Sequence, residues 1–171
     1  MTMCMINDAL IKKLISDFPL HLKSINGPEH WGRVLEYGLE LAKETGADEE
    51  VVMYFAVFHD CARGKDGRDF RHGERGAMIA ETLRGNLYEL SEDKFIKLIY
   101  ACTHHTDGLI DSDPTIGTCW DADRLDLPRV GIIPSLKKLS THAAKNPEKI
   151  EECGRKSKSY YVPEFVLKEW M

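Results

Sequence analysis

The chain has 171 residues, of which 43% are hydrophobic and 30% charged, and its formal net charge at pH 7 is −5. This size suits one domain with a sizeable core. The acidic balance argues against a broad electrostatic surface for duplex nucleic acid, but not against a small phosphorylated ligand. No stretch reaches the ~20 apolar residues of a membrane span, and the N-terminus has no signal-like start. We therefore expect a cytoplasmic protein without a membrane partner.

Apolar residues recur at helical spacing in successive segments, and turn-forming residues separate these segments. The segments expected to be helical are 5–16, 28–44, 49–62, 70–83, 92–105, 116–125, 135–144 and 163–170. Asp48, Asp69 and Thr115 are the expected N-caps of three of them. The polar stretch 146–158 is expected to be mobile. Because alternation with a period of two is scarce, the predicted fold is all-α, with six to eight helices around one core.

The cysteines give no sign of a disulfide framework. There are five of them, none in a C-x-x-C pair, namely Cys4, Cys61, Cys102, Cys119 and Cys153. An odd number without a framework spacing predicts reduced, buried thiols in a reducing compartment.

The most apolar segment, Val51–Phe58, ends in the dipeptide His59-Asp60. A helix with no polar face is buried on all sides. An imidazole and a carboxylate at its end are costly to bury unless they are paired or bind a metal ion. For an isolated His-Asp pair, a core histidine bonded to its neighbour is the simpler interpretation.

Several other polar residues share the inward faces of the predicted helices and lie near helix ends. With the dipeptide, the set is His30, His59, Asp60, His72, His104, His105 and Asp123. Imidazole nitrogen and carboxylate oxygen are ligands of borderline divalent ions. Seven groups exceed what one ion needs and suit two ions about 3.5–4 Å apart.

Helical periodicity separates the carboxylates of the late helix. Asp123 shares a face with Cys119 and Trp120, whereas Asp121 lies about 200° away at 100° per residue. Asp123 is therefore the predicted ligand, and Asp126, one turn further on, is a candidate to support the ligands. Gly76, four residues after His72, is expected to leave room beside that imidazole.

The pattern His30, His59-Asp60 and Asp123 resembles the HD-domain metal-dependent phosphohydrolases over roughly residues 26–130. His72 and the doublet His104-His105 resemble the additional ligands of the dinuclear branch, which includes HD-GYP cyclic-dinucleotide phosphodiesterases. The Gly-Tyr-Pro motif of those enzymes is absent after the doublet. The resemblance implies a single HD domain over residues 1–171, with a core of about 26–130 and a helical extension at 131–171.

The resemblance also implies how the ions are shared. One ion would take His30, His59, Asp60 and Asp123, and the other would take Asp60, His72, His104 and His105. The bridging residue would be Asp60, and the ions could be Mn, Fe, Zn, Ni, Co or Mg.

The activity implied is hydrolysis of a small phosphate ester by a metal-bridging hydroxide, with a nucleotide-like substrate as the expected partner. Asp60 is the expected catalytic ligand, and Arg63 and Arg124 are candidates to hold the phosphate. The cations that follow form either a phosphate-facing rim or a solvated loop paired with neighbouring acids; they are Lys65, Arg68, Arg71 and Arg75.

Three alternatives stay open at this stage. The first is a dinuclear-iron oxygenase of the HD fold, although the doublet His104-His105 favours hydrolysis. The second is a metal-containing binding or sensor protein without turnover. The third is a nucleotidase with one ion on His30, His59, Asp60 and Asp123.

Overall fold

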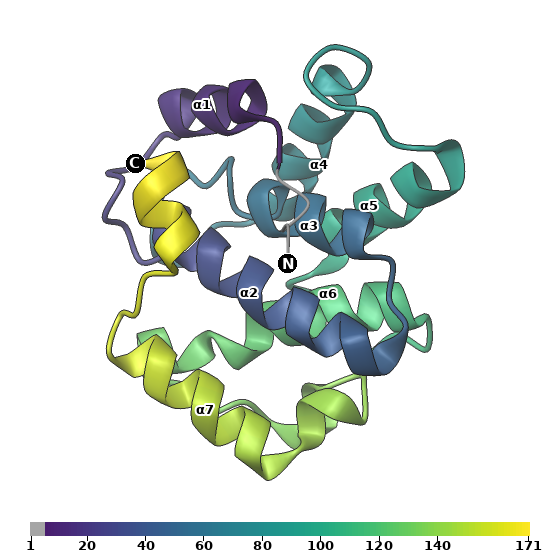
Figure 1. Cartoon of the computed structure of the whole chain (residues 1–171), viewed down its shortest axis with the longest axis vertical. Coiled ribbons are helices and arrows are strands. Elements are labelled where there is room, and N and C mark those ends of the chain that lie inside the picture. The colour runs from purple at the N-terminus through teal and green to yellow at the C-terminus, as the bar shows by residue number, and fades with distance from the viewer. Residues whose placement is uncertain (1–5) are drawn as a thin grey trace.

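The computed structural model describes residues 6–171, and this part of the chain is all-α, as the periodicity predicts. It contains seven α-helices and four short helical turns, and no strand among the described residues (Figure 1). The α-helices are α1 (Asp8–Asp17), α2 (Pro28–Thr45), α3 (Glu49–Phe58), α4 (His72–Leu83), α5 (Glu92–His104), α6 (Pro114–Leu125) and α7 (Pro147–Lys158). The short turns are η1 (Leu127–Val130), η2 (Leu136–Lys138), η3 (Ala143–Lys145) and η4 (Val166–Trp170).

Helix α3 forms the centre of the bundle. Every residue of Val51–Phe58 is buried, as expected for a helix with no polar face. Helices α2, α4, α5 and α6 all pack against it, and α2 also packs along α6 (Figure 1). The polar dipeptide at the end of α3 is therefore surrounded by four other helices.

Two glycines allow α4 to approach its neighbours closely. A Cβ atom at Gly76 would lie 2.2 Å from the Phe58 carbonyl oxygen, so this glycine fits α4 against the end of α3. A Cβ atom at Gly73 would lie 2.3 Å from the Cys102 carbonyl oxygen and 2.9 Å from His105 Nδ1. The structure thus corrects the sequence interpretation: Gly76 makes room for a carbonyl group, and Gly73 is the glycine beside an imidazole.

The predicted N-caps have different outcomes. The Asp48 carboxylate accepts the Val51 amide, as predicted. Helix α6 is capped by Asp113 instead of Thr115, whose hydroxyl accepts the Asp48 amide. Asp69 does not cap α4, because its carboxylate accepts the Gly64 amide and pairs with a later arginine.

The last third of the chain departs most from expectation. Residues 135–144 do not form one helix, because the buried Asp121 carboxylate accepts the amides of Ser140 and Thr141 at 2.7 and 2.8 Å. The prediction that 146–158 is mobile was wrong: α7 begins after the Asn146 cap with proline at its first position and buries one face. The last expected helix, 163–170, is confirmed, because residues 164–170 are helical, with the π-helical turn η4 over Val166–Trp170.

The cysteines and the length of the helices bear on two further expectations, which concern buried thiols and membrane spans. Cys61, Cys102, Cys119 and Cys153 are buried and unpaired, and Cys4 lies outside the described residues. Among the helices described, none combines the length and the apolar character needed to cross a membrane.

Candidate metal centre

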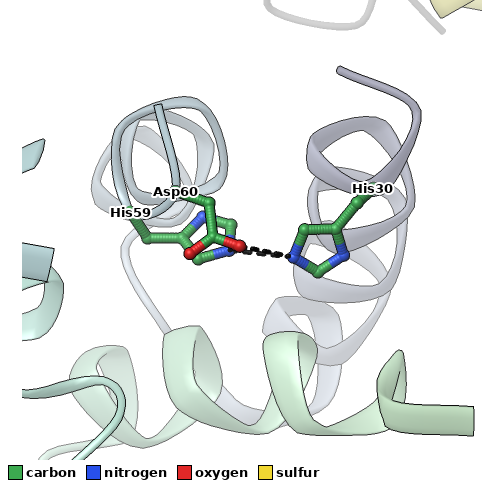
Figure 2. Close-up of side chains that lie close together, drawn as sticks. All are labelled: His30, His59 and Asp60. Atoms are coloured by element: carbon green, nitrogen blue, oxygen red, sulfur yellow. Dashed lines mark hydrogen bonds and ion pairs between the residues drawn. The ribbon is translucent and has the colours of Figure 1, made fainter. Parts of the chain in front are cut away.

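Three buried side chains meet where the first turn of α2 faces the end of α3. His30 comes from α2, and His59 and Asp60 lie in the turn that ends α3; Figure 2 shows them pointing toward one another. His30 Nε2 lies 3.1 Å from His59 Nε2 and 3.4 Å from Asp60 Oδ2. These distances place three potential ligand atoms around one point.

The other oxygen of Asp60 belongs to a second buried group. Asp60 Oδ1 lies 3.1 Å from His72 Nε2 and 3.5 Å from His105 Nε2, and these two nitrogens are 3.0 Å apart. His72 is the first residue of α4, and His105 directly follows α5. One carboxylate thus contributes one oxygen atom to each group.

Asp123 joins the first group from α6. Its Oδ1 lies 3.3 Å from His30 Nε2 and 3.5 Å from His59 Nε2. Its side chain is 18% exposed, whereas those of Asp60 and the two histidines are at most 2% exposed. Asp123 is therefore the member of the first group that faces solvent, and Asp121 lies elsewhere as a buried structural residue.

The four inward imidazoles share one orientation. Each Nδ1 lies next to an oxygen acceptor: Asp126 Oδ2 for His30, the Phe55 and Ala56 carbonyls for His59, the Asp69 carbonyl for His72 and the Cys102 carbonyl for His105. These acceptors assign the proton to Nδ1, which leaves the Nε2 lone pair of a neutral ring toward the centre.

In their neutral form the imidazoles bring electron-rich atoms close together. With neutral rings, two Nε2 lone pairs face one another within each group, at 3.1 Å for His30 and His59 and at 3.0 Å for His72 and His105. The buried Asp60 Oδ1 accepts no hydrogen bond. Facing lone pairs repel unless a cation lies between them, so the donor set fits divalent metal ions.

The charges of the cluster favour a cation at its centre. Burial and Arg129 lower the pKa of His30, but the carboxylates of Asp123, Asp126 and Asp60 outweigh them and raise that pKa to about 9, so without a metal ion the ring is protonated at neutral pH, and a divalent ion would replace the proton on Nε2. Burial alone would raise the pKa of Asp60, but the surrounding histidines hold it well below its usual range. The centre therefore keeps its carboxylates ionised and attracts positive charge.

The structure does not bring His104 to either group. Its side chain is exposed and packs against Tyr100, with ring centroids 4.7 Å apart. Consecutive helical residues point about 100° apart, so only one member of a doublet can face the centre. The second group therefore brings together three candidate ligands, Asp60, His72 and His105, and not the four expected.

A cleft of about 300 Å³ leads to the centre. Asp60, His105 and Asp123 line it, together with cationic residues and aliphatic side chains. The cations are Arg63, Arg124, Arg129 and Lys138, and the aliphatic residues are Leu109, Leu127, Ile132 and Ile133. No Phe, Tyr or Trp residue is among those that line the cleft.

The two arginines proposed for phosphate binding differ in how far their terminal nitrogens are already hydrogen-bonded. Arg124 is buried, and its terminal nitrogens donate to the carbonyls of Gly108, Leu109 and Lys138. These bonds join the two walls of the cleft and occupy both terminal nitrogens, and a direct contact of Arg124 with phosphate stays a prediction. Arg63 Nη1 donates a hydrogen bond to the Gly67 carbonyl. Its Nε lies 3.2 Å from Asp60 Oδ1 without forming a hydrogen bond.

The loop after Asp60 matches the solvated interpretation better than a phosphate-facing rim. Arg71 pairs with Glu74 and Arg75 pairs with Asp69. Arg68 lies over the ring of the exposed Phe70. His21 and His142, which had no place in the ligand pattern, are both exposed.

Sequence reasoning found only part of what supports the ligands. Asp126, noted for its position one turn after Asp123, binds His30 Nδ1 at 2.7 Å and pairs with the buried Arg33. Arg33 and Ser157 were missed. Ser157 lies in the stretch expected to be mobile, where no sequence pattern indicated a contact with the centre.

A family described as the HD domain matches residues 28–145, a range that contains both ligand groups and ends before α7. No curated protein and no solved structure matches the chain.

Proposed function

Because the chain belongs to the HD domain family, whose members are generally metal-dependent phosphohydrolases, we propose that it hydrolyses a small phosphate ester with two divalent ions. One observation carries the proposal: two buried groups of inward lone pairs share the carboxylate of Asp60. That geometry favours two ions over the single ion of a mononuclear nucleotidase.

The ligands divide between the two ions by the oxygen atom of Asp60 that they face. His30, His59 and Asp123 would hold one ion with Asp60 Oδ2, and His72 and His105 would hold the other with Asp60 Oδ1. Divalent ions bound there would act as Lewis acids toward a phosphoester and would lower the pKa of water.

The chain itself supplies the cationic grip on the substrate. Arg63 lines the cleft beside Asp60, and a guanidinium can bind two phosphate oxygens at once. Lys138 is exposed on the opposite segment of the lining and can add a point charge. Arg124 acts indirectly, because its bonds to three carbonyls fix the shape of the walls.

The cleft lining bears on the substrate. Leu109, Ile132 and Ile133 offer an aliphatic surface, and the lining contains no Phe, Tyr or Trp side chain to stack on a base. Trp120 and Tyr54, which could stack on a base if exposed, are buried. These features support a compact phosphate ester at least as well as a nucleotide.

The test combines metal analysis with a substrate panel. Metal-free protein is reloaded separately with Mn²⁺, Fe²⁺, Zn²⁺, Ni²⁺, Co²⁺ or Mg²⁺, and release of phosphate or alcohol is followed for alkyl phosphomonoesters, a phosphodiester, mononucleotides and cyclic nucleotides. We expect two ions per chain and hydrolysis that is equally fast without O₂.

Each competing function has its own result in this experiment. Turnover that requires O₂ would indicate the oxygenase. One ion per chain with nucleotide hydrolysis would indicate the mononuclear nucleotidase. Two ions without turnover of any ester would indicate a binding or sensor protein.

A further inference from the structure

The C-terminal helix α7 lies outside the matched family range, yet it reaches the metal centre. Ser157, near the end of α7, is fully buried. Its hydroxyl donates to Asp126 Oδ1, and it also lies 3.4 Å from the Leu125 carbonyl. The side chain therefore points from α7 into the region directly behind the ligands.

Asp126 connects Ser157 to His30, a candidate metal ligand. Its Oδ2 accepts the Nδ1 proton of His30 at 2.7 Å, and Arg33 Nε donates to both of its oxygens, at 2.8 and 3.1 Å. The carboxylate is fully buried. Because Ser157 and Arg33 hold Oδ1, Oδ2 stays aligned with the imidazole and fixes the direction of its inward lone pair.

A second contact ties the same network to the end of the chain. Arg33 Nη1 donates to the Tyr161 carbonyl at 2.9 Å, three residues beyond the end of α7. In Figure 1, α7 runs along the lower edge of the molecule, beside the 3₁₀ turn η1 that follows α6. The C-terminal segment thus supplies one partner of Asp126 Oδ1, Ser157, and binds the other, Arg33, through the Tyr161 carbonyl.

We propose that Ser157 is a positioning residue for the metal ligand His30, acting through Asp126, so that the C-terminal extension is part of the metal centre. This inference rests on the metal binding in the proposed function. It concerns one half of the centre only, because no described contact joins Ser157 or Asp126 to His72 or His105.

The test is Ser157→Ala, measured by calorimetric titration of metal-free protein with Mn²⁺. Affinity for one ion should fall about 10-fold, at the lower end of the effect of losing an outer hydrogen-bond partner, while the other ion binds as before. In a His105→Ala background, where only the His30 half remains, the retained ion should show the same loss. Ser157→Thr, which keeps the hydroxyl, should restore the affinity.

The matched control is Tyr37→Phe. The Tyr37 hydroxyl contacts Ser157 Oγ and the Cys153 carbonyl, each at 3.2 Å, and does not touch Asp126. The control therefore removes a neighbouring buried hydroxyl and leaves the bond from Ser157 to Asp126 in place. Both Mn²⁺ affinities should stay within about 2-fold, the spread expected of a substitution away from the ligands.

Three results overturn the inference. The first is an unchanged affinity for both ions in Ser157→Ala, which leaves the proposed function intact. The second is an equal loss at both ions that Tyr37→Phe reproduces, because it would reflect general loosening. Unaltered protein that binds no Mn²⁺ overturns this inference and the proposed metal chemistry together.

Discussion

The two halves of the metal centre are built in different ways. His59, His72 and His105 are each oriented by a backbone carbonyl three residues earlier in the chain. His30 is oriented by the carboxylate of Asp126, which is 96 residues away. Three imidazoles are thus set by their own helix end or turn, and the fourth depends on tertiary structure.

This difference shows what each half is sensitive to. A local carbonyl keeps its place as long as the turn is formed, so the His72 and His105 half depends mainly on the close approach of α4 and α5. The His30 half depends on a buried charged network that includes Arg33, Asp126 and Ser157. Substitutions can therefore weaken one half and spare the other, and only the shared Asp60 should affect both.

The largest effect is expected for Asp60→Asn. The substitution keeps the shape but removes the charge and one acceptor oxygen, so both ions should bind more than about 100-fold more weakly, beyond the range for an outer partner. Phosphoester hydrolysis should disappear with them. Elemental analysis and Mn²⁺ titration measure the loss.

The control for Asp60→Asn is Asp107→Asn, which neutralises an exposed carboxylate that lines the same cleft. It should retain both ions. If Asp60→Asn also retained both, the idea of a carboxylate shared by the two halves would have to be abandoned.

Gly73→Ala should disrupt only the half of the centre formed by His72 and His105. Its methyl group would meet the Cys102 carbonyl, which is the acceptor that orients His105. We expect a loss of about 1–3 kcal/mol in the free energy of unfolding, typical of overpacking, together with loss of the ion at His72 and His105. Urea denaturation and metal content give the two quantities.

The comparison variant is Gly67→Ala, at a glycine with open space around its Cβ position. Gly67→Ala should change neither the free energy of unfolding nor the metal content. Retention of two ions by a destabilised Gly73→Ala protein would show that His105 can move without losing its ligand role.

Arg63→Gln should reduce turnover without removing an ion. The guanidinium lines the cleft beside Asp60 but is not one of the ligands, so we expect hydrolysis to slow about 100-fold, as for loss of one donor to a developing charge. Steady-state kinetics on the Mn²⁺-loaded protein measure this. Unchanged kinetics would transfer the phosphate-binding role to another cation of the cleft.

The smallest effect is expected for His104→Ala. This side chain is exposed and packs only on Tyr100, so the free energy of unfolding should change by less than about 0.5 kcal/mol, and both ions should remain. His105→Ala is the counterpart and should lose one ion. A lost ion in His104→Ala would mean that the doublet acts as a pair.

Local patterns carried much of the site prediction. The apolar run before His59-Asp60 indicated burial, and helical spacing separated Asp123 from Asp121. The structure buries the dipeptide and places Asp123 beside His59. The same spacing argument, applied to the doublet, would have placed only one of His104 and His105 inward. The bonds of Arg124 to the Leu109 and Lys138 carbonyls were not foreseen, because carbonyl partners in other segments leave no trace in the spacing of side chains.

The sequence by itself determined the helices up to residue 125 and the residue types that could bind a metal, because both follow from short-range periodicity and side-chain chemistry. Only the tertiary structure decided that Asp60 gives one oxygen to each group, that Gly73 admits α4 beside His105, and that Ser157 reaches Asp126. These are contacts between segments far apart in the chain. Their geometry depends on how helices pack, which no local pattern encodes.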